Sequence, residues 1–287
     1  MHYNLAMSDL NQQEPVYLSM SVVLYRNEAS QLARFREALV AAVACLREQL
    51  PVAKVSLAVV DNAAAENRQS QLASLFARVP GFDAVRFIQA ETNLGYGRAH
   101  NRCLEQGADI HLILNPDVYL AVDALVVGVR YLLANPHVGM VTPYGENDQG
   151  EPLFLCKRQP SVLDFLLRGF APAFVKSFFA PRLARYEMQD VYLGSVPCDT
   201  IEIASGCCML VRSAVLRQLG GFSEAYFLYF EDFDLCVRLR EKTAIAFVPA
   251  MKIVHDGGQA ARKGWWHITR FARSGFRFFS DHGWRWF

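Results

Sequence analysis

Acidic side chains follow two apolar segments in the first half of the chain. Asp61 comes directly after VSLAVV, and Asp117 follows IHLIL within Asn115-Pro116-Asp117. A carboxylate at Asp61 can accept a hydrogen bond from a ribose hydroxyl or a base N–H. One at Asp117 can hold a hard divalent cation that also contacts a substrate diphosphate. The alternative for both is a turn or a helix cap, because Asp and Asn favour such positions.

The second half of the chain contains a further set of acids and a histidine. Glu231 and Asp232 lie in FLYFEDFDLCVRLR, and His255 follows the apolar stretch that ends at Val254. Taken singly, these acids are also typical of the N-terminus of an amphipathic helix, where the helix dipole stabilises them.

A glycine-rich segment connects a predicted strand to a predicted helix. It runs Asn93-Leu94-Gly95-Tyr96-Gly97-Arg98-Ala99-His100-Asn101, and its backbone N–H groups can face an anionic ligand. GYGRAH resembles a dinucleotide fingerprint, but His100 replaces the third glycine and the segment follows the third strand instead of the first. The pattern argues against a Rossmann dehydrogenase, and a plain strand-to-helix connection is the alternative.

Strands and helices are expected to alternate through the first half. β-branched, apolar runs predict strands, and long series of Ala, Leu, Arg and Glu predict helices. The predicted strands are 20–25, 55–60, 84–89 and 110–114, and the predicted helices are 29–50, 69–78 and 96–106. This order predicts an α/β fold with a mostly parallel sheet flanked by helices, in which ligands bind at the carboxyl ends of the strands.

Composition and charge exclude several classes of protein. The 287 residues carry a net charge of +1, which gives no case for a general nucleic-acid binder. The seven cysteines form no C-x-x-C pair, so we expect neither a disulfide framework nor a zinc ribbon, and a reduced cytosolic setting fits best. We expect no signal peptide at the start of the chain, and no apolar run reaches the roughly 20 residues of a membrane span.

The last 29 residues combine six basic side chains with one acidic side chain and many aromatic ones. On a helix, one face would carry Trp265, Ile268, Ala272, Phe276 and Phe279, and another Arg262, Lys263, Arg270, Arg273 and Arg277. This pattern predicts an amphipathic helix at an anionic membrane surface. A helix that packs on the body of the protein or on a partner subunit is the alternative.

Read in order, VVLY, VVDN, NLGYGRAHN, LNPD, the segment from SGCCMLV to FEDFDLCVRLR, and VPAMKIVH resemble family 2 glycosyltransferases of the GT-A fold. Within that family the chain is similar to bacterial rhamnosyltransferases that build O-antigen or related polysaccharides on a polyprenyl-diphosphate carrier. The resemblance implies an N-terminal extension over residues 1–19, a GT-A domain over 20–258 and a tail over 259–287. Residues 20–120 would bind the nucleotide-sugar and residues 121–258 the acceptor.

The resemblance also implies a role for each motif residue. Donor binding would involve Tyr25, Asp61, Asn93, Gly95, Gly97, Asn101, Asn115 and Asp117. Asp117 and His255 would ligate Mg²⁺ or Mn²⁺, and Asn115-Pro116-Asp117 stands where the family often has D-x-D. Asp232 would be the catalytic base of an inverting displacement, and Glu231 would orient the acceptor or the base, with an exchange of these two roles as the alternative.

The expected activity is transfer of L-rhamnose from dTDP-β-L-rhamnose to a lipid-diphosphate-linked GlcNAc or a growing glycan. The enzyme would act in the cytoplasm, peripherally on the inner face of the plasma membrane. A family 2 transferase that uses a UDP-hexose or UDP-HexNAc donor is the first alternative, and a non-catalytic nucleotide-sugar or glycan-binding subunit is the second. The aromatic and basic insertion 151–197 is expected to cover the acceptor, with packing against the sheet as its alternative.

Overall fold

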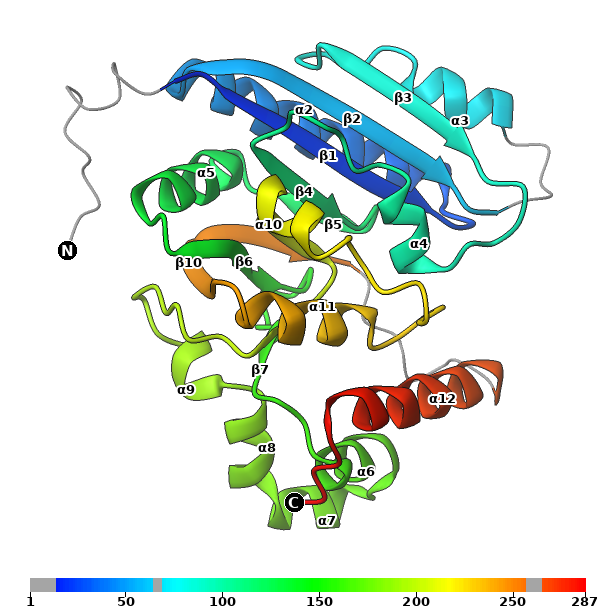
Figure 1. The fold of residues 1–287 in the computed structure, drawn as a ribbon, viewed down its shortest axis with the longest axis vertical. Helices are drawn as coiled ribbons and strands as arrows, with labels where there is room; N and C mark the ends of the chain where they lie inside the picture. The colour runs from blue at the N-terminus through cyan, green and yellow to red at the C-terminus, as the bar shows by residue number, and fades with distance from the viewer. Residues whose placement is uncertain (1–13, 64–68, 257–264) are drawn as a thin grey trace.

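The computed structural model describes residues 14–63, 69–256 and 265–287, and its first half alternates strands and helices as the sequence predicts (Figure 1). The elements are β1 (Val16–Leu24), α2 (Ala29–Gln49), β2 (Val52–Asp61), α3 (Gln69–Phe76), β3 (Ala84–Gln89), α4 (Tyr96–Asn101) and β4 (Ile110–Leu114). The helix predicted to reach residue 106 ends at Asn101, because the next N–H groups bond carbonyls three residues back. β1 begins at Val16, within the predicted N-terminal extension.

The second half supplies the rest of the sheet and most of the shorter helices. A first group comprises β5 (Val118–Leu120), α5 (Ala124–Ala134), β6 (Val138–Glu146), β7 (Cys156–Lys157), α6 (Val162–Phe170), α7 (Ala173–Phe178), α8 (Ala180–Tyr186) and α9 (Gln189–Tyr192). A second comprises β8 (Ile203–Ala204), β9 (Cys208–Arg212), α10 (Ser213–Gln218), α11 (Glu231–Arg240), β10 (Ala244–His255) and α12 (Trp265–His282).

Eight strands form one sheet in the order β3-β2-β1-β4-β9-β6-β10-β5. β1 pairs in parallel with β2 and β4, β2 with β3, and β6 with β10. β9 runs antiparallel between β4 and β6, and β5 runs antiparallel to β10. Every residue of β4 is buried because helices cover both faces of the sheet, with α2 behind it and α10 and α11 in front in Figure 1.

The insertion 151–197 packs against this sheet through α9. Tyr192 is fully buried, its ring stacks on Phe247 with centroids 4.8 Å apart, and its hydroxyl donates to the Gly145 carbonyl at 2.9 Å. Of the two expectations for this insertion, packing against the sheet therefore holds for α9. The helices α6, α7 and α8 extend below the sheet (Figure 1).

Helix α12 docks on the body of the protein, beside α6 and below α11 (Figure 1). Phe278 and Phe279 are buried in a cluster with Tyr226 and Phe230. The predicted apolar face is thus divided, because Phe279 is buried whereas Phe276 remains 65% exposed. Of the other predicted tail residues, Arg262 and Lys263 lie outside the described residues, as does the side chain of Trp265.

No helix in the described ranges is long and apolar enough to cross a membrane.

Two histidines are buried between β1, β4 and α4. His111 bonds Ser19 at 2.7 Å and Ser21 at 2.8 Å, and His100 bonds Ser21 at 2.7 Å. Burial lowers the pKa of His100 to about 3, with the nearby His111 as a smaller cause, and it lowers the pKa of His111 to about 4. Both imidazoles therefore stay neutral in the folded protein over a range of pH in which an unfolded chain binds protons.

We expect the free energy of unfolding to fall as the pH is lowered from about 6.5 towards 4. In this window the unfolded state protonates both histidines and the folded state does not, so each contributes a slope of about 1.4 kcal/mol per pH unit at most. Urea denaturation at several pH values measures the slope. His111→Gln should make it shallower by one histidine's share, and an unchanged slope in this variant would contradict the assignment.

Candidate active site

The predicted donor residues lie together at the carboxyl ends of β1, β2 and β4. Asp61 is buried at the end of β2, where its Oδ1 accepts the N–H of Ala63 at 3.1 Å. Tyr25, directly after β1, is half exposed. Beside it opens a cavity of about 490 Å³, whose lining includes Arg26, Asn27, Arg34, Tyr119 and Asp256. The arginines in this lining are suited to phosphate oxygens, and the sequence analysis assigned them no role.

Asn62 organises the loop that precedes α4. Its amide donates to Asn93 Oδ1 and to the Gly95 carbonyl, both at 3.0 Å, and its Oδ1 accepts the N–H of Leu94 at 2.8 Å. Asn93 Oδ1 also accepts the N–H of Gly95 at 2.9 Å. Asn62 was visible in the VVDN motif but received no role, because its contacts are made with a loop more than 30 residues later.

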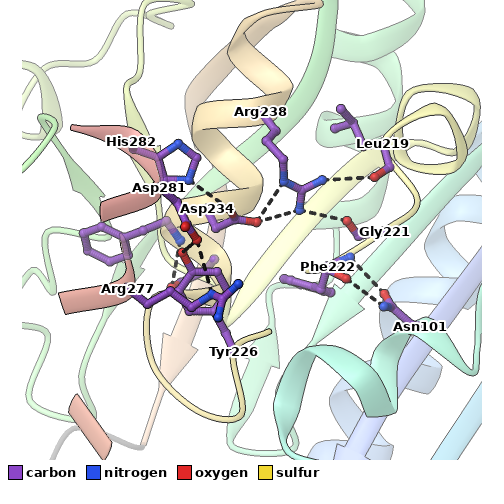
Figure 2. Close-up of polar contacts among 12 residues, drawn as sticks. Asn101, Leu219, Gly221, Phe222, Tyr226, Asp234, Arg238, Arg277, Asp281 and His282 are labelled. Carbon is purple, nitrogen blue, oxygen red and sulfur yellow. Dashed lines mark hydrogen bonds and ion pairs between the residues drawn. The ribbon is translucent and has the colours of Figure 1, made fainter. Parts of the chain in front are cut away.

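The two glycines and Asn101 of the glycine-rich segment contact the chain that leads to α11. Gly95 has φ +81°, and a Cβ there would lie 2.1 Å from the Phe227 carbonyl oxygen. A Cβ on Gly97 would lie 2.7 Å from the Phe222 side chain. The Asn101 amide exchanges two hydrogen bonds with the Phe222 backbone, at 2.8 and 2.9 Å (Figure 2). These contacts hold two distant segments together, and direct donor binding by Gly95, Gly97 and Asn101 stays a prediction.

Asp117 and His255 are neighbours because β5 and β10 pair antiparallel, with His255 opposite Val118. Asp117 Oδ2 lies 3.4 Å from His255 Nε2. Burial lowers the pKa of His255, but hydrogen bonding to Asp117 and Cys207 outweighs it and raises that pKa to about 10. At neutral pH the pair is therefore an aspartate and an imidazolium, and His255 Nε2 would have to release its proton before it could ligate a cation.

These groups fit a divalent cation that is shared with a substrate. The side-chain oxygens Asp117 Oδ1 and Asn115 Oδ1 are buried and have no hydrogen-bond partner among the described residues. The described residues contain no group of three His, Cys, Asp or Glu able to hold a metal by themselves. Asp117 and His255 would thus leave coordination positions to diphosphate oxygens and water, as Mg²⁺ prefers.

Glu231, which is buried, and Asp232, which is partly exposed, begin α11. Asp232 Oδ2 accepts the N–H of Gly206 at 2.9 Å, and its Oδ1 accepts that of Phe233 at 3.0 Å. Glu231 Oε2 is buried without a hydrogen-bond partner in the described part of the chain. Burial raises the pKa of both carboxyls, and the negative charge of Asp232 raises that of Glu231 further. Raised pKa values are suited to proton transfer near neutral pH.

Tyr96 connects the predicted donor residues to these carboxyls. Its N–H donates to the Phe227 carbonyl at 3.1 Å, and its hydroxyl donates to the Gly206 carbonyl at 2.5 Å. Burial raises the pKa of Tyr96, so the phenol remains a donor. The N–H of the same Gly206 donates to Asp232. The backbone of Gly206 therefore contacts both Tyr96 of the donor loop and Asp232 of α11. The sequence placed Tyr96 in the glycine-rich segment but did not indicate these contacts, because Phe227 and Gly206 are more than 100 residues away along the chain.

The backbone directly before α11 is strained. Tyr229 and Phe230 have φ +69° and +67°, a region that costs a bulky residue roughly 1–3 kcal/mol. Helix α12 supports this turn: Ser274 Oγ donates to the Leu228 carbonyl at 2.9 Å, and the Phe230 ring packs 5.5 Å from that of Phe278, centroid to centroid. Such strain is typical of functional sites, where surrounding contacts stabilise it.

A polar network fixes the other end of α12 to α11 (Figure 2). Asp234 accepts from His282 at 2.9 Å and from Arg238 at 2.8 Å, and Arg238 in turn donates to the carbonyls of Leu219 and Gly221. Helix α12 is thus a part of the structure that positions Glu231 and Asp232.

No family model matches the chain. Its sequence is 28% identical over 229 residues to the N-acetylglucosaminyl-diphospho-decaprenol L-rhamnosyltransferase of Mycobacterium tuberculosis, which covers 72% of this chain and 71% of that relative. It is 26% identical over 150 residues to the rhamnosyltransferase WbbL of Escherichia coli, covering 51% of this chain and 52% of WbbL.

The fold is similar to that of the mannosyltransferase PcManGT from Pyrobaculum calidifontis, whose structure was solved in complex with GDP-Man and Mn²⁺. The TM-score is 0.59 at 19% identity, and the match covers 93% of this chain and 64% of that one. At this identity the likeness concerns the fold alone.

We expect Gly95→Ala to destabilise the protein more than Gly150→Ala. Both glycines have positive φ, but the new methyl group meets the Phe227 carbonyl only at position 95, whereas position 150 opens to empty space. The control should lose about 1 kcal/mol from backbone strain, and Gly95→Ala at least about 2 kcal/mol more because the loop must shift. Chemical denaturation measures both, and equal losses would contradict the close contact.

Proposed function

We propose that this chain, a glycosyltransferase of the GT-A fold whose sequence resembles rhamnosyltransferases, transfers L-rhamnose from dTDP-β-L-rhamnose to a lipid-diphosphate-linked GlcNAc or growing glycan. Its product would enter a bacterial cell-surface polysaccharide such as an O-antigen. One arrangement supports the proposal: Asp117 Oδ2 lies 3.4 Å from His255 Nε2, where a cation and a diphosphate would bind, and Tyr96 and Gly206 connect the donor loop to the carboxyl of Asp232. The relatives from M. tuberculosis and E. coli are rhamnosyltransferases, which supports rhamnose as the transferred sugar.

The donor would bind across the carboxyl ends of the strands. Asp61 would accept a hydrogen bond from the nucleoside, Tyr25 would contact the base from its half-exposed position, and Asn93 and Asn115 would line the sugar and diphosphate side. Asp117 and His255 would hold Mg²⁺ or Mn²⁺, and the Mn²⁺ in the PcManGT structure supports a divalent cation. When bound, the cation neutralises the charge that develops on the leaving diphosphate.

Asp232 is proposed as the general base. Its carboxylate would take the proton of the acceptor hydroxyl as that oxygen bonds to the anomeric carbon and the bond to the nucleoside diphosphate breaks. Attack from the opposite face inverts the β-linked donor to an α-linked product. Glu231, whose Oε2 lacks a partner among the described residues, would accept a hydrogen bond from the acceptor. An exchange of roles between the two acids is the alternative.

The same proposal places the enzyme on the cytoplasmic face of the plasma membrane, at an anionic lipid surface. The last residues present exposed aromatic side chains, with Trp284 stacked between Phe279 and Trp286 and with Phe276 beside it. Such rings are suited to the headgroup boundary of a bilayer. Phe174 and Phe178 of α7 are also exposed.

We expect the purified protein with Mg²⁺ or Mn²⁺ to add one deoxyhexose to a synthetic lipid-diphosphate-GlcNAc acceptor when dTDP-rhamnose is the donor. Product mass measures the transfer, and UDP-glucose, UDP-GlcNAc and GDP-mannose serve as matched donors. Transfer from only one of these three donors would mean that rhamnose is the wrong sugar, while the protein would still be a glycosyltransferase. Tight donor binding in calorimetry without transfer from any donor would instead favour a non-catalytic nucleotide-sugar-binding subunit.

We expect Asp232→Asn to lower kcat by about 10²- to 10⁴-fold, the usual contribution of a general base. Binding of the donor nucleotide should change little, since Asp232 lies on the acceptor side of Tyr96. Glu241→Gln is the matched control, because it removes an exposed acid at the other end of α11 and should retain turnover. Retained turnover in Asp232→Asn, together with its collapse in Glu231→Gln, would exchange the two roles.

A further inference from the structure

A basic groove of about 460 Å³ lies between α12, the start of α4 and the segment before α11. Its lining includes Arg98, Phe227, Arg270, Arg273, Phe276 and Arg277. The groove is separate from the cavity beside Tyr25 and from the residues assigned to the donor.

The charge in the groove is only partly neutralised. Arg277 pairs with Asp281 at 3.3 Å (Figure 2). Arg270 stacks on Phe227 and Trp266, with its guanidinium carbon 5.0 and 5.2 Å from the ring centroids, and pairs with no acid in the described residues. Arg273 forms no hydrogen bond or ion pair with any residue of the described ranges.

The spacing of these arginines makes their mutual repulsion unavoidable. Arg270, Arg273 and Arg277 are three and four residues apart on α12, so they share one face of the helix. Like charges at such spacing destabilise a helix by a few tenths of a kcal/mol per pair, and a bound anion relieves this repulsion. Guanidinium groups bind phosphate oxygens in pairs of parallel hydrogen bonds, which favours an oxyanion with several oxygens, such as a diphosphate.

The walls of the groove combine this charge with apolar surface. Phe276 lines the groove and is exposed. Trp266, also exposed, lies outside the lining but against the wall residue Phe227, with ring centroids 6.2 Å apart. An anion with an attached hydrocarbon chain would contact both kinds of side chain. An inorganic anion would leave the aromatic surface uncovered.

Direct contacts connect the groove to the proposed base. Phe227 in its wall accepts the N–H of Tyr96, whose hydroxyl donates to Gly206, and Gly206 in turn donates to Asp232. Arg98 extends from the same short helix as Tyr96 and donates to the Glu224 carbonyl at 2.8 Å. A ligand in the groove therefore lies against the loop that ends at the catalytic carboxyls.

We infer that this groove binds the diphosphate of the lipid-linked acceptor, with Arg270 and Arg273 as its main ligands. The inference rests on the proposed function, which it deepens by assigning the acceptor's diphosphate to named residues. Bound there, the diphosphate places the first sugar of the acceptor towards Asp232, and the prenyl chain leaves along Phe276 and Trp266 towards the membrane.

Farnesyl diphosphate binding tests the inference without any transfer reaction. The measurement is calorimetry on the full chain in the presence of a chelator, which keeps metal-dependent binding at Asp117 and His255 out of the signal. We expect Arg273→Gln to weaken binding at least tenfold and Arg270→Gln/Arg273→Gln to abolish it. Farnesol, which lacks the diphosphate, should bind at least tenfold more weakly than farnesyl diphosphate.

Arg285→Gln is the matched control, because it removes one positive charge from the same tail outside the groove. It should leave farnesyl diphosphate binding unchanged. Phosphatidylglycerol vesicles form a second arm: if the arginines serve only lipid headgroups, Arg273→Gln and Arg285→Gln weaken vesicle binding alike and neither affects farnesyl diphosphate. That result, or equal binding of farnesol, would overturn the inference.

Steady-state transfer separates the two proposals. If both hold, Arg273→Gln raises the KM for the lipid-diphosphate acceptor at least tenfold with little change in the KM for the donor. If the wild type transfers sugar and Arg273→Gln has the same KM for the acceptor and for the donor, the groove does not bind the acceptor's diphosphate. The proposed glycosyltransferase function is then unaffected. If the wild type transfers no sugar but binds farnesyl diphosphate in an Arg273-dependent manner, the function fails and the diphosphate site stands.

Discussion

The left-handed turn at Tyr229 and Phe230 is the constraint on which the site depends. It leads into α11, which begins with Glu231 and Asp232, and the segment before it contacts the start of α4 through Phe227 and Tyr96. Two bulky residues do not adopt positive φ without compensation. The compensation comes from α12, whose Ser274 bonds the Leu228 carbonyl and whose Phe278 packs against Phe230. The C-terminal segment, which the sequence predicted to be a membrane-binding tail, therefore supports the position of the two acids proposed for catalysis.

The two adjacent acids at the start of α11 differ in their contacts, because Asp232 accepts two backbone N–H groups whereas Glu231 Oε2 has no hydrogen-bond partner among the described residues. Placing Glu231 and Asp232 side by side away from water opposes ionisation of both, which is why their pKa values rise. The N-terminus of α11 and the N–H of Gly206 offset part of that cost. The oxygens left without partners, on Glu231, Asn115 and Asp117, lie where a substrate and its cation would supply the missing contacts.

The apolar side chains of α12 divide into a buried group and an exposed group, because the rest of the protein covers only part of its apolar face. Phe278 packs against Phe233 of α11 and Phe279 against Phe165 of α6. Phe276 and Ile268 remain exposed. The arginines lie between these two regions and line the groove. Helix α12 thus contacts the turn before Glu231 with one face and lines the groove proposed for the lipid-linked acceptor with another.

Local sequence patterns were sufficient to predict the alternation of strands and helices in the first half and the polar residues at the strand ends. β-branched runs and amphipathic stretches predicted the strands and helices of the first half, with the bounds of β3 and β4 matched in full. Asp61, Asp117, Asp232 and His255 were identified because their motifs resemble those of a known family. These signals are local, since they depend on residue type and spacing along the chain.

The tertiary structure sets which of these residues contact one another. The antiparallel pairing of β5 with β10 brings His255 to Asp117, and Tyr96 reaches Gly206 and Phe227 across the boundary between the two halves. It also decided which flank of α12 is buried, because an apolar arc of that width allows more than one docked orientation. Strand order and side-chain packing set these contacts between residues far apart in the chain, and no local pattern encodes them.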